Sequence, residues 1–180
     1  MAKSVSHFSR LLALSAFIVA ATVGNAAAQT AERGGFTLLV NLGVGIQNDT
    51  VLEESAVGLA GANLGIGGFV TPDLAILGRF SGTNVSYDTV FGDYAQVSGV
   101  VAPTLQYWAN DKVNIEGGVG VGFWSAEDES EKGVGLILGV GFTVFNRGKH
   151  NLQVGFEYAP AFMDSGTVHN MGITFGYQLF

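Results

Sequence analysis

The feature that most constrains this chain is an alternation of bulky apolar residues with small or polar ones, which recurs throughout the sequence after residue 35. In the segment from Phe36 to Ile46, bulky apolar residues take one parity, while threonine, asparagine and glycine take most of the other. Successive side chains of a strand point to opposite faces, whereas a helical face repeats every three or four residues. The alternation therefore predicts strands with one bulky apolar face and one small polar face.

Eight segments have this alternation, and they run 36–46, 60–70, 74–80, 97–107, 113–123, 134–144, 152–162 and 171–179. Short connections rich in turn-forming residues, at 71–73, 109–112 and 146–150, alternate with longer or more polar ones at 48–56, 87–94, 125–132 and 163–168. An even number of strands with alternating connections predicts an all-β, eight-stranded antiparallel up-and-down barrel. Pro103 and Pro160 lie within two segments, and we expect them at bulges or strand ends because proline cannot donate to a ladder.

The glycines indicate which face of the barrel is inside. The sequence has 27 glycines in 180 residues, and within the segments they gather on the small polar face. An eight-stranded barrel has an interior just wide enough for side chains, so its lumen has room for the small face and not for the bulky one. A bulky apolar exterior would aggregate in water but suits lipid. We therefore predict a transmembrane barrel, with a soluble periplasmic barrel as the structural alternative.

The N-terminus has the three parts of a secretory signal peptide. These are the basic residues Lys3, His7 and Arg10, an apolar run from Leu11 to Val23, and a small-residue cleavage site at Ala26-Ala27-Ala28. We expect residues 1–28 to be removed and residues 29–180 to form the barrel. The alternative, a retained anchor, needs a longer apolar run. Because the sequence has no cysteine, it has neither disulfides nor thiolate metal sites.

The export signal, the eight alternating segments and a last segment that ends in an aromatic residue resemble the small eight-stranded bacterial outer-membrane barrels of the OmpA and OmpX type. The resemblance implies a monomer in the cell outer membrane of a Gram-negative bacterium, in contact with its lipids and lipopolysaccharide. It also implies that Phe175, Tyr177 and Phe180 form a signal for the outer-membrane assembly machinery. Phe180 is one residue out of step with the other two, so either a local bulge restores the pattern or recognition tolerates the slip.

Three charged residues fall on the inward face of the predicted barrel: Arg79, Glu116 and Glu157. Buried charges are costly unless they are paired, so we expect a lumen network in which Arg79 meets one or both carboxylates. Paired carboxylates also serve as acid and base in hydrolysis. A lumen filled by side chains leaves no substrate cleft, so the network is predicted to be structural.

Aromatic residues gather near the segment ends, where the boundaries of a bilayer favour them. They are Tyr107, Trp108, Phe123, Trp124, Phe145, Tyr177 and Phe180. Trp108, Trp124 and Phe145 fall on the inward parity, so these three either belong to an aromatic girdle or plug the ends of the barrel.

The charges divide between the two ends of the predicted barrel. If the short turns face the periplasm, as in the resembled family, the outer connections are acidic against a single lysine, Lys132. The acidic loop residues are Asp49, Glu53, Glu54, Glu127, Asp128, Glu129 and Glu131. Such a rim could bind divalent cations beside lipopolysaccharide, but we prefer the interpretation that charge keeps the loops hydrated. A net charge of −7 with only 8 lysines and arginines argues against a nucleic-acid partner.

Three functions follow, in order of preference. The first is a structural or surface-interaction role, in adhesion or defence, for a barrel whose lumen is plugged by side chains. The second is a narrow conduit for small or apolar solutes, lined by the inward residues Leu39, Leu59, Phe69, Leu77 and Ile137. The third is a lipid A-modifying enzyme that uses His169 near Asp164 and Ser165, since His150 lies on the other side. The sequence has no nucleophile motif or phosphate-binding loop, so we predict no enzyme, no metal and no cofactor.

Overall fold

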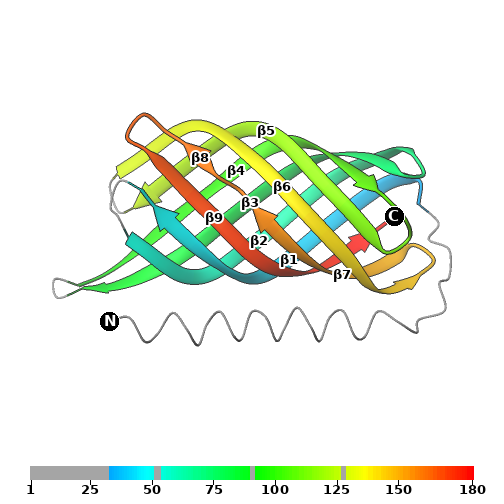
Figure 1. Ribbon diagram of the computed structural model, residues 1–180, viewed down its shortest axis with the longest axis horizontal. Helices are drawn as coiled ribbons and strands as arrows, with labels where there is room; N and C mark the ends of the chain where they lie inside the picture. The colour runs from blue at the N-terminus through cyan, green and yellow to red at the C-terminus, as the bar shows by residue number, and fades with distance from the viewer. Residues whose placement is uncertain (1–32, 51–53, 90–91, 127–128) are drawn as a thin grey trace.

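The structure is a computed structural model that describes residues 33–50, 54–89, 92–126 and 129–180, and these form one closed antiparallel sheet (Figure 1). Its strands are β1 (Gly35–Asp49), β2 (Glu54–Thr71), β3 (Leu74–Thr89), β4 (Gly92–Trp108), β5 (Val113–Ala126), β6 (Glu129–Arg147), β7 (His150–Tyr158), β8 (Ala161–Phe162) and β9 (Thr167–Leu179). Pairing of β9 with β1 closes the sheet. Closure leaves the barrel wall without a free edge, so its backbone groups are satisfied within the sheet.

The strands β7 and β8 are two parts of one strand that is interrupted at Pro160. Both parts pair with β6 and with β9, and the register is the same on either side of the break. The barrel is therefore a ring of eight strands, as the sequence predicts. A bulge or strand end at Pro103 is not observed, because β4 pairs through this residue with Gly78 of β3 and keeps one register with β5. An antiparallel strand donates to its two neighbours alternately, so one missing N–H interrupts a single side.

Register shifts occur elsewhere, and they correct two predictions. A shift in β2 lies between Ala60 and Leu64, and one in β6 lies between Thr143 and Phe145. One extra residue moves the following side chains to the other face of the sheet. Leu59, predicted to line the lumen, is therefore on the outside with 70% of its surface exposed. Phe145, predicted on the inward parity, is also on the outside and plugs nothing.

The strands are longer than the apolar segments that predict them. Asp49 pairs with Glu54, Thr89 with Gly92, and Ala126 with Glu129, so most of three predicted polar connections is paired strand. Backbone pairing does not need apolar side chains, and the hairpins can extend beyond the apolar band. We name the end with these hairpins and the β8–β9 connection the loop end. The opposite end, with the turns after β2, β4 and β6 and with Phe180, is the turn end.

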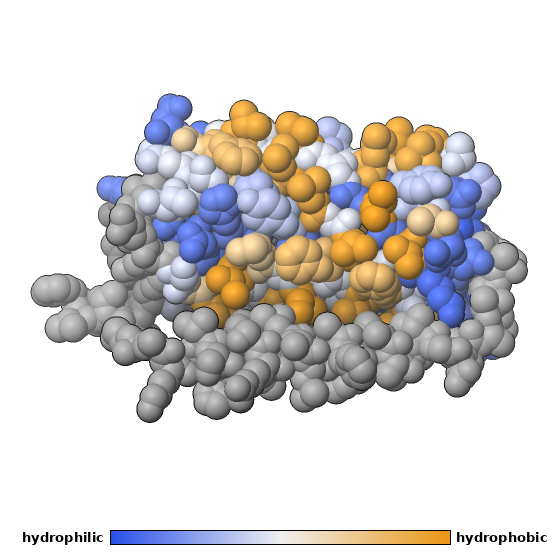
Figure 2. Space-filling model, viewed as in Figure 1, coloured by the Kyte–Doolittle hydropathy of each residue, from blue (hydrophilic) through white to orange (hydrophobic). Residues whose placement is uncertain are grey.

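The bulky apolar face is the outer surface of the barrel. Leu138 and Phe175 are exposed, whereas Asn41 and Gln106 are buried in the lumen. Figure 2 shows apolar side chains across the middle of the visible face and hydrophilic ones towards its ends. Nowhere in the described ranges is there a helix of the length and apolarity that a membrane crossing requires. The arrangement of the faces is the one that the glycine pattern predicts.

Candidate functional site

The candidate site is the lumen, where side chains from opposite walls meet at three levels along the barrel axis. We name these levels the central tier, the turn-end tier and the loop-end tier. Their largest fully buried polar side chains are those of Arg79, Gln47, Gln96, Gln106 and Gln178. A small apolar cluster of Val100, Ala102, Ile137 and Ala159 also lies in the lumen.

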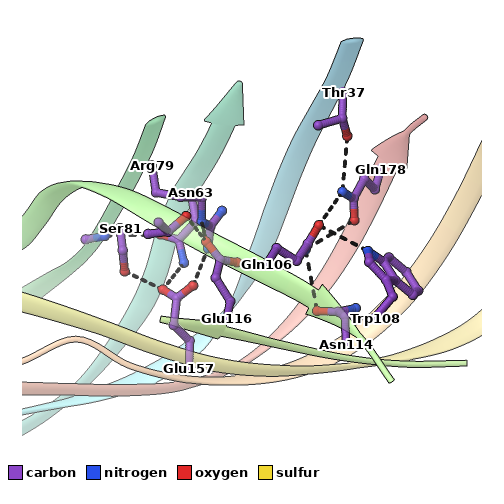
Figure 3. A network of polar contacts seen from close by, with 12 residues as sticks. Thr37, Asn63, Arg79, Ser81, Gln106, Trp108, Asn114, Glu116, Glu157 and Gln178 are labelled. Atoms are coloured by element: carbon purple, nitrogen blue, oxygen red, sulfur yellow. Dashed lines mark hydrogen bonds and ion pairs between the residues drawn. The ribbon is translucent and has the colours of Figure 1, made fainter. Parts of the chain in front are cut away.

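The central tier consists of Arg79 on β3, Glu116 on β5 and Glu157 on β7 with their neighbours (Figure 3). The Nε atom of Arg79 lies 2.8 Å from Oε1 of Glu116, and its Nη2 lies 2.5 Å from Oε2 of Glu157. The Arg79 side chain is 1% exposed. One cation therefore bridges two carboxylates across the lumen, and the structure brings together all three charged residues that the sequence places inside.

Both carboxylates of the central tier also accept hydrogen bonds from neutral side chains. Asn63 Nδ2 donates to Glu157 Oε1 over 2.7 Å, and Ser81 Oγ donates to the same oxygen. Thr104 Oγ1 donates to Glu116 Oε1 over 2.6 Å. These donors complete the surroundings that buried carboxylates need. Parity alone places Ser81 and Thr104 inside, but the sequence gives no sign of which charge each one contacts.

Two glycines of the inward face make room for the polar side chains. A β-carbon at Gly65 would lie 2.7 Å from Cδ of Arg79, and one at Gly176 would lie 2.0 Å from Oδ1 of Asn41. Arg79 and Asn41 thus lie directly against glycine backbone. This is the structural reason why glycine accompanies the polar residues on the inward parity.

The turn-end tier is a chain of amide hydrogen bonds. Gln178 Nε2 donates to Gln106 Oε1 over 2.7 Å and to Thr37 Oγ1 over 3.1 Å. Trp108 Nε1 also donates to Gln106 Oε1, over 3.3 Å (Figure 3). The tier links β1, β4 and β9 and closes the lumen beside the turns.

Aromatic rings close the turn end outside this tier. The Trp108 and Phe180 rings pack edge to face with centroids 5.3 Å apart, and Phe180 packs on Phe69 at 5.6 Å. Trp108 therefore plugs the barrel end, whereas Trp124 is half-buried near the loop end. Phe180 is 3% exposed and points inward, and the register of β9 with β1 has no shift up to Leu179. Of the three residues of the predicted assembly signal, Phe175 and Tyr177 lie on the outer face and Phe180 does not.

Arg33, just before β1, covers the aromatic rings. Its Nη2 lies 3.1 Å from Oδ1 of Asp73 and 3.2 Å from Oδ1 of Asp111, which belong to two different turns. Its guanidinium lies over the Trp108 ring, 4.8 Å from the centroid. The Nε atom donates to the carbonyl of Pro72 over 2.9 Å. The sequence gives no sign of this role, because no periodicity marks a residue that precedes the first strand.

The loop-end tier joins β1 to β4 across the lumen. Gln96 Nε2 donates to Asp49 Oδ2 over 3.2 Å, and Ser98 Oγ lies 2.9 Å from Oε1 of Gln47 and 2.7 Å from Oδ1 of Asn170. Asp49 is only 2% exposed. Its predicted place in an outer acidic loop is therefore wrong, because β1 extends through this residue and its side chain has the inward parity.

The other acidic residues of the predicted rim lie at the loop end as far as they are described. Glu54 begins β2, and Glu129 is exposed at the start of β6, while Glu53, Glu127 and Asp128 lie outside the described residues. Glu131 lies beyond the exposed apolar side chains of β6, which begin at Val134. Hydrogen bonds from the hydroxyl and then the backbone N–H of Ser165 lower the pKa of Glu131 below its ordinary value.

The residues singled out for enzymatic chemistry are not assembled into one site. His169 Nδ1 lies 2.7 Å from Oη of Tyr158, and the two rings are stacked. Ser165 instead contacts Glu131. His150 Nδ1 lies 2.6 Å from Oη of Tyr177 at the turn end. No hydrogen bond between His169 and Ser165 is found among the residues that the structure describes.

The residues predicted to line a conduit do not share one position in the barrel. Leu39, Leu77 and Ile137 are buried in the lumen, and Phe69 belongs to the aromatic closure of the turn end. A cavity of about 20 Å³ lies between Arg79, Glu116 and Glu157. That volume has room for about one water molecule and for no larger solute.

No known protein-family profile and no curated protein matches the sequence. Solved structures do match the fold. Ail, the attachment invasion locus protein of Yersinia pestis, solved in complex with the heparin analogue sucrose octasulfate, has a TM-score of 0.59 and 16% identity over 82% of this chain and 99% of its own. Neisserial surface protein A has a TM-score of 0.57 and 15% identity over 81% of this chain and 96% of its own. The chain has the fold of the small eight-stranded outer-membrane barrels, which confirms the predicted fold class.

Proposed function

We propose that the chain is a Gram-negative outer-membrane protein that acts at the cell surface, in adhesion or defence, while its closed barrel serves as a structural part of the membrane. The observation that carries this proposal is the lumen, which direct side-chain contacts bridge in three tiers. A barrel closed in this way transmits no solute, so its contribution comes from its surfaces. The similar structures support a surface role because one is an attachment invasion locus protein and the other a surface protein.

The loop end of this chain favours a partner that differs from the sucrose octasulfate in the Ail complex. Asp88 pairs with Asp93 across the end of the β3–β4 hairpin, and Glu129 is exposed at the end of the β5–β6 hairpin. Acidic residues gathered at the ends of the hairpins create a negative potential that repels a polyanion such as sucrose octasulfate. We therefore propose that the partner is a cationic surface, or lipopolysaccharide reached through divalent cations.

Adhesion of whole cells tests the surface role. Cells that produce the chain are compared with cells that produce the D88N/D93N/E129Q variant, on a surface coated with a cationic polypeptide and on one coated with heparin. We expect the chain to increase attachment to the cationic surface only, and the variant to lose most of that increase. A control variant with K149Q, at the turn end, should attach like the unmodified chain. Equal attachment by all strains would contradict the surface role.

Planar-bilayer recording separates the closed barrel from the conduit. We expect no steady channel events from the purified chain, because the central tier and the turn-end aromatic rings block the lumen. Regular events of constant conductance would instead favour the conduit for small or apolar solutes. The lipid A-modifying enzyme has the least support, since His169 and Ser165 contact different partners. Unchanged lipid A in cells that produce the chain, with or without H169A, would count against it.

Cell fractionation tests the placement in the membrane. We propose that residues 1–28 are removed on export and that the assembly machinery inserts the remaining chain as a monomer. The chain should then occur in the outer-membrane fraction, begin near residue 29 on N-terminal sequencing and show a heat-modifiable shift on gel electrophoresis. Recovery from the soluble periplasm would contradict the placement and support a soluble barrel.

A further inference from the structure

The turn between β6 and β7 presents basic side chains at the turn end. Arg147 pairs with His150 across the turn, and only Gly148 and Lys149 lie between them. Gly148 has a φ of 58°, in the left-handed region that tight hairpin turns require. The side chains of Arg147, Lys149 and His150 are all exposed. The turn thus holds three nitrogen-bearing side chains within four consecutive residues, in a fixed backbone.

This basic turn lies just beyond the apolar band of the barrel. Phe145 and Leu152, which face each other on β6 and β7, are 51% and 45% exposed on the outer surface. Arg147 lies two residues after Phe145 and His150 two residues before Leu152, so both are on the same face, roughly 7 Å further towards the turn. Tyr177 of β9 faces Leu152, and its hydroxyl oxygen lies 2.6 Å from Nδ1 of His150. Tyrosine beside apolar residues is typical of the membrane boundary, the level at which lipid phosphates lie.

Among the acidic side chains that the structure describes, none forms an ion pair with this turn. The acids of the two other turns, Asp73 and Asp111, are both held by Arg33. Within the described residues, neither the Arg147 nor the Lys149 side chain has an ion-pair or hydrogen-bond partner. The backbone is fixed nonetheless, because the N–H of Phe180 donates to the carbonyl of Lys149 over 2.9 Å. The backbone of the turn is therefore held in place, and its cationic side chains are available to an outside anion.

We propose that the β6–β7 turn binds the headgroup phosphate of an anionic phospholipid in the leaflet at the turn end. The Arg147 guanidinium matches two phosphate oxygens, and Lys149 adds a second positive charge. The long side chains of both residues can reach along the apolar surface to the headgroup level. The acidic loop end repels the same headgroups, so the lipid preference is confined to one end of the barrel. This inference rests on the membrane placement proposed above.

Paramagnetic relaxation in lipid nanodiscs tests the inference. The isotopically labelled full-length chain, purified from producing cells, is placed in phosphatidylcholine discs that contain a small fraction of spin-labelled phosphatidylglycerol, with the label on the acyl chain near the glycerol. Matched discs contain spin-labelled phosphatidylcholine instead. We expect stronger broadening of the amide signals of residues 146–151 and 177 by the anionic lipid. In the R147Q/K149Q variant the preference should fall by about fivefold for each charge removed, and high salt should weaken it.

The control is K132Q, which removes the lysine of the loop end and should leave the preference unchanged. The heat-modifiable shift reports whether each variant folds, so loss of the preference in a folded R147Q/K149Q barrel supports the site. Equal broadening by both lipids would overturn the inference, as would a preference that survives in that variant. Binding of soluble anionic peptidoglycan fragments without any lipid preference would also overturn it. Failure of the chain to enter the discs would contradict the membrane placement itself.

Discussion

At the scale of single residues, Arg79 is the side chain on which the lumen most depends, because two buried carboxylates share its charge. Replacing it with methionine should leave Glu116 and Glu157 buried without a cation. Breaking a buried ion pair on one side costs about 3 to 5 kcal/mol. We expect R79M to lower the free energy of unfolding by that amount, measured by urea titration of the barrel in lipid vesicles.

The triple variant R79M/E116Q/E157Q is the matched control for this prediction. It removes the uncompensated charges, so it should recover most of the lost stability. A loss of less than about 1 kcal/mol in R79M, the scale of an exposed ion pair, would contradict the central role of Arg79.

Whether the face of a single residue can be predicted depends on whether a register shift separates it from the apolar residues around it. The inward position of Arg79, Glu116 and Glu157 follows from parity, because no register shift separates each of them from the apolar residues that set the period. The predicted inward position of Leu59 is wrong because β2 has a bulge between Ala60 and Leu64. A pattern of period two does not reveal one inserted residue. The partners within the lumen depend on the shear of the closed barrel, which no local pattern contains.

At the scale of elements, Arg33 connects parts of the barrel that are not neighbours in the ladder. It ties the start of β1 to the turns after β2 and β4 and covers Trp108. We expect R33A to destabilise the barrel by about 1 to 2 kcal/mol, since the contacted carboxylates are partly exposed. Amide hydrogen exchange of residues 108–112 should accelerate. The R33K variant keeps the charge without the planar guanidinium, so its stability should lie between those of R33A and the unmodified chain. Unchanged exchange rates in R33A would contradict the proposed link between Arg33 and the two turns.

The connection between β8 and β9 is tied to β6 through Glu131 and Ser165. The pKa of Glu131 is lowered in the folded chain from its ordinary value of 4.5, chiefly by the Ser165 hydroxyl. A lowered pKa means that the ionised form is favoured by folding, so this contribution is present above pH 4.5 and is lost as the pH falls through the folded value. We expect the protection factor of the Ser165 amide, its exchange rate compared with that of an unstructured peptide at the same pH, to fall as the pH drops through the folded value, and E131Q should remove this pH-dependent change. A pH-dependent fall in the protection factor that persists in E131Q would show that another group is responsible.

The elements themselves follow from the sequence more completely than their ends do. Each of the eight apolar segments lies within a strand or within the β7–β8 pair, because alternation over ten residues suits nothing but a two-sided strand. The extension of the strands past the apolar band cannot be predicted from the sequence, since paired polar residues such as Asp49 and Glu54 have no periodic signal. The inward orientation of the Phe180 side chain follows from its parity in the sequence. No sequence pattern predicts that its ring packs on Trp108 and Phe69.

At the scale of the whole molecule, the barrel separates an apolar exterior from a polar lumen and an acidic end from a basic one. The exterior could be predicted because an eight-stranded barrel cannot hold the bulky face. The proposed surface role and the proposed lipid site use opposite ends of this charge distribution. Both belong to one account of the barrel, in which side chains close the lumen while the outer face lies in lipid.

Cysteine accessibility tests this account most directly, because the chain has no cysteine of its own. Val101 and Ala102 are consecutive residues of β4 with 51% and 2% of their surfaces exposed. In the membrane-inserted barrel, V101C should react with a lipid-soluble maleimide and not with a charged one, and A102C should react with neither until the barrel is unfolded. Rapid reaction of A102C with the charged reagent in the folded barrel would contradict the closed lumen.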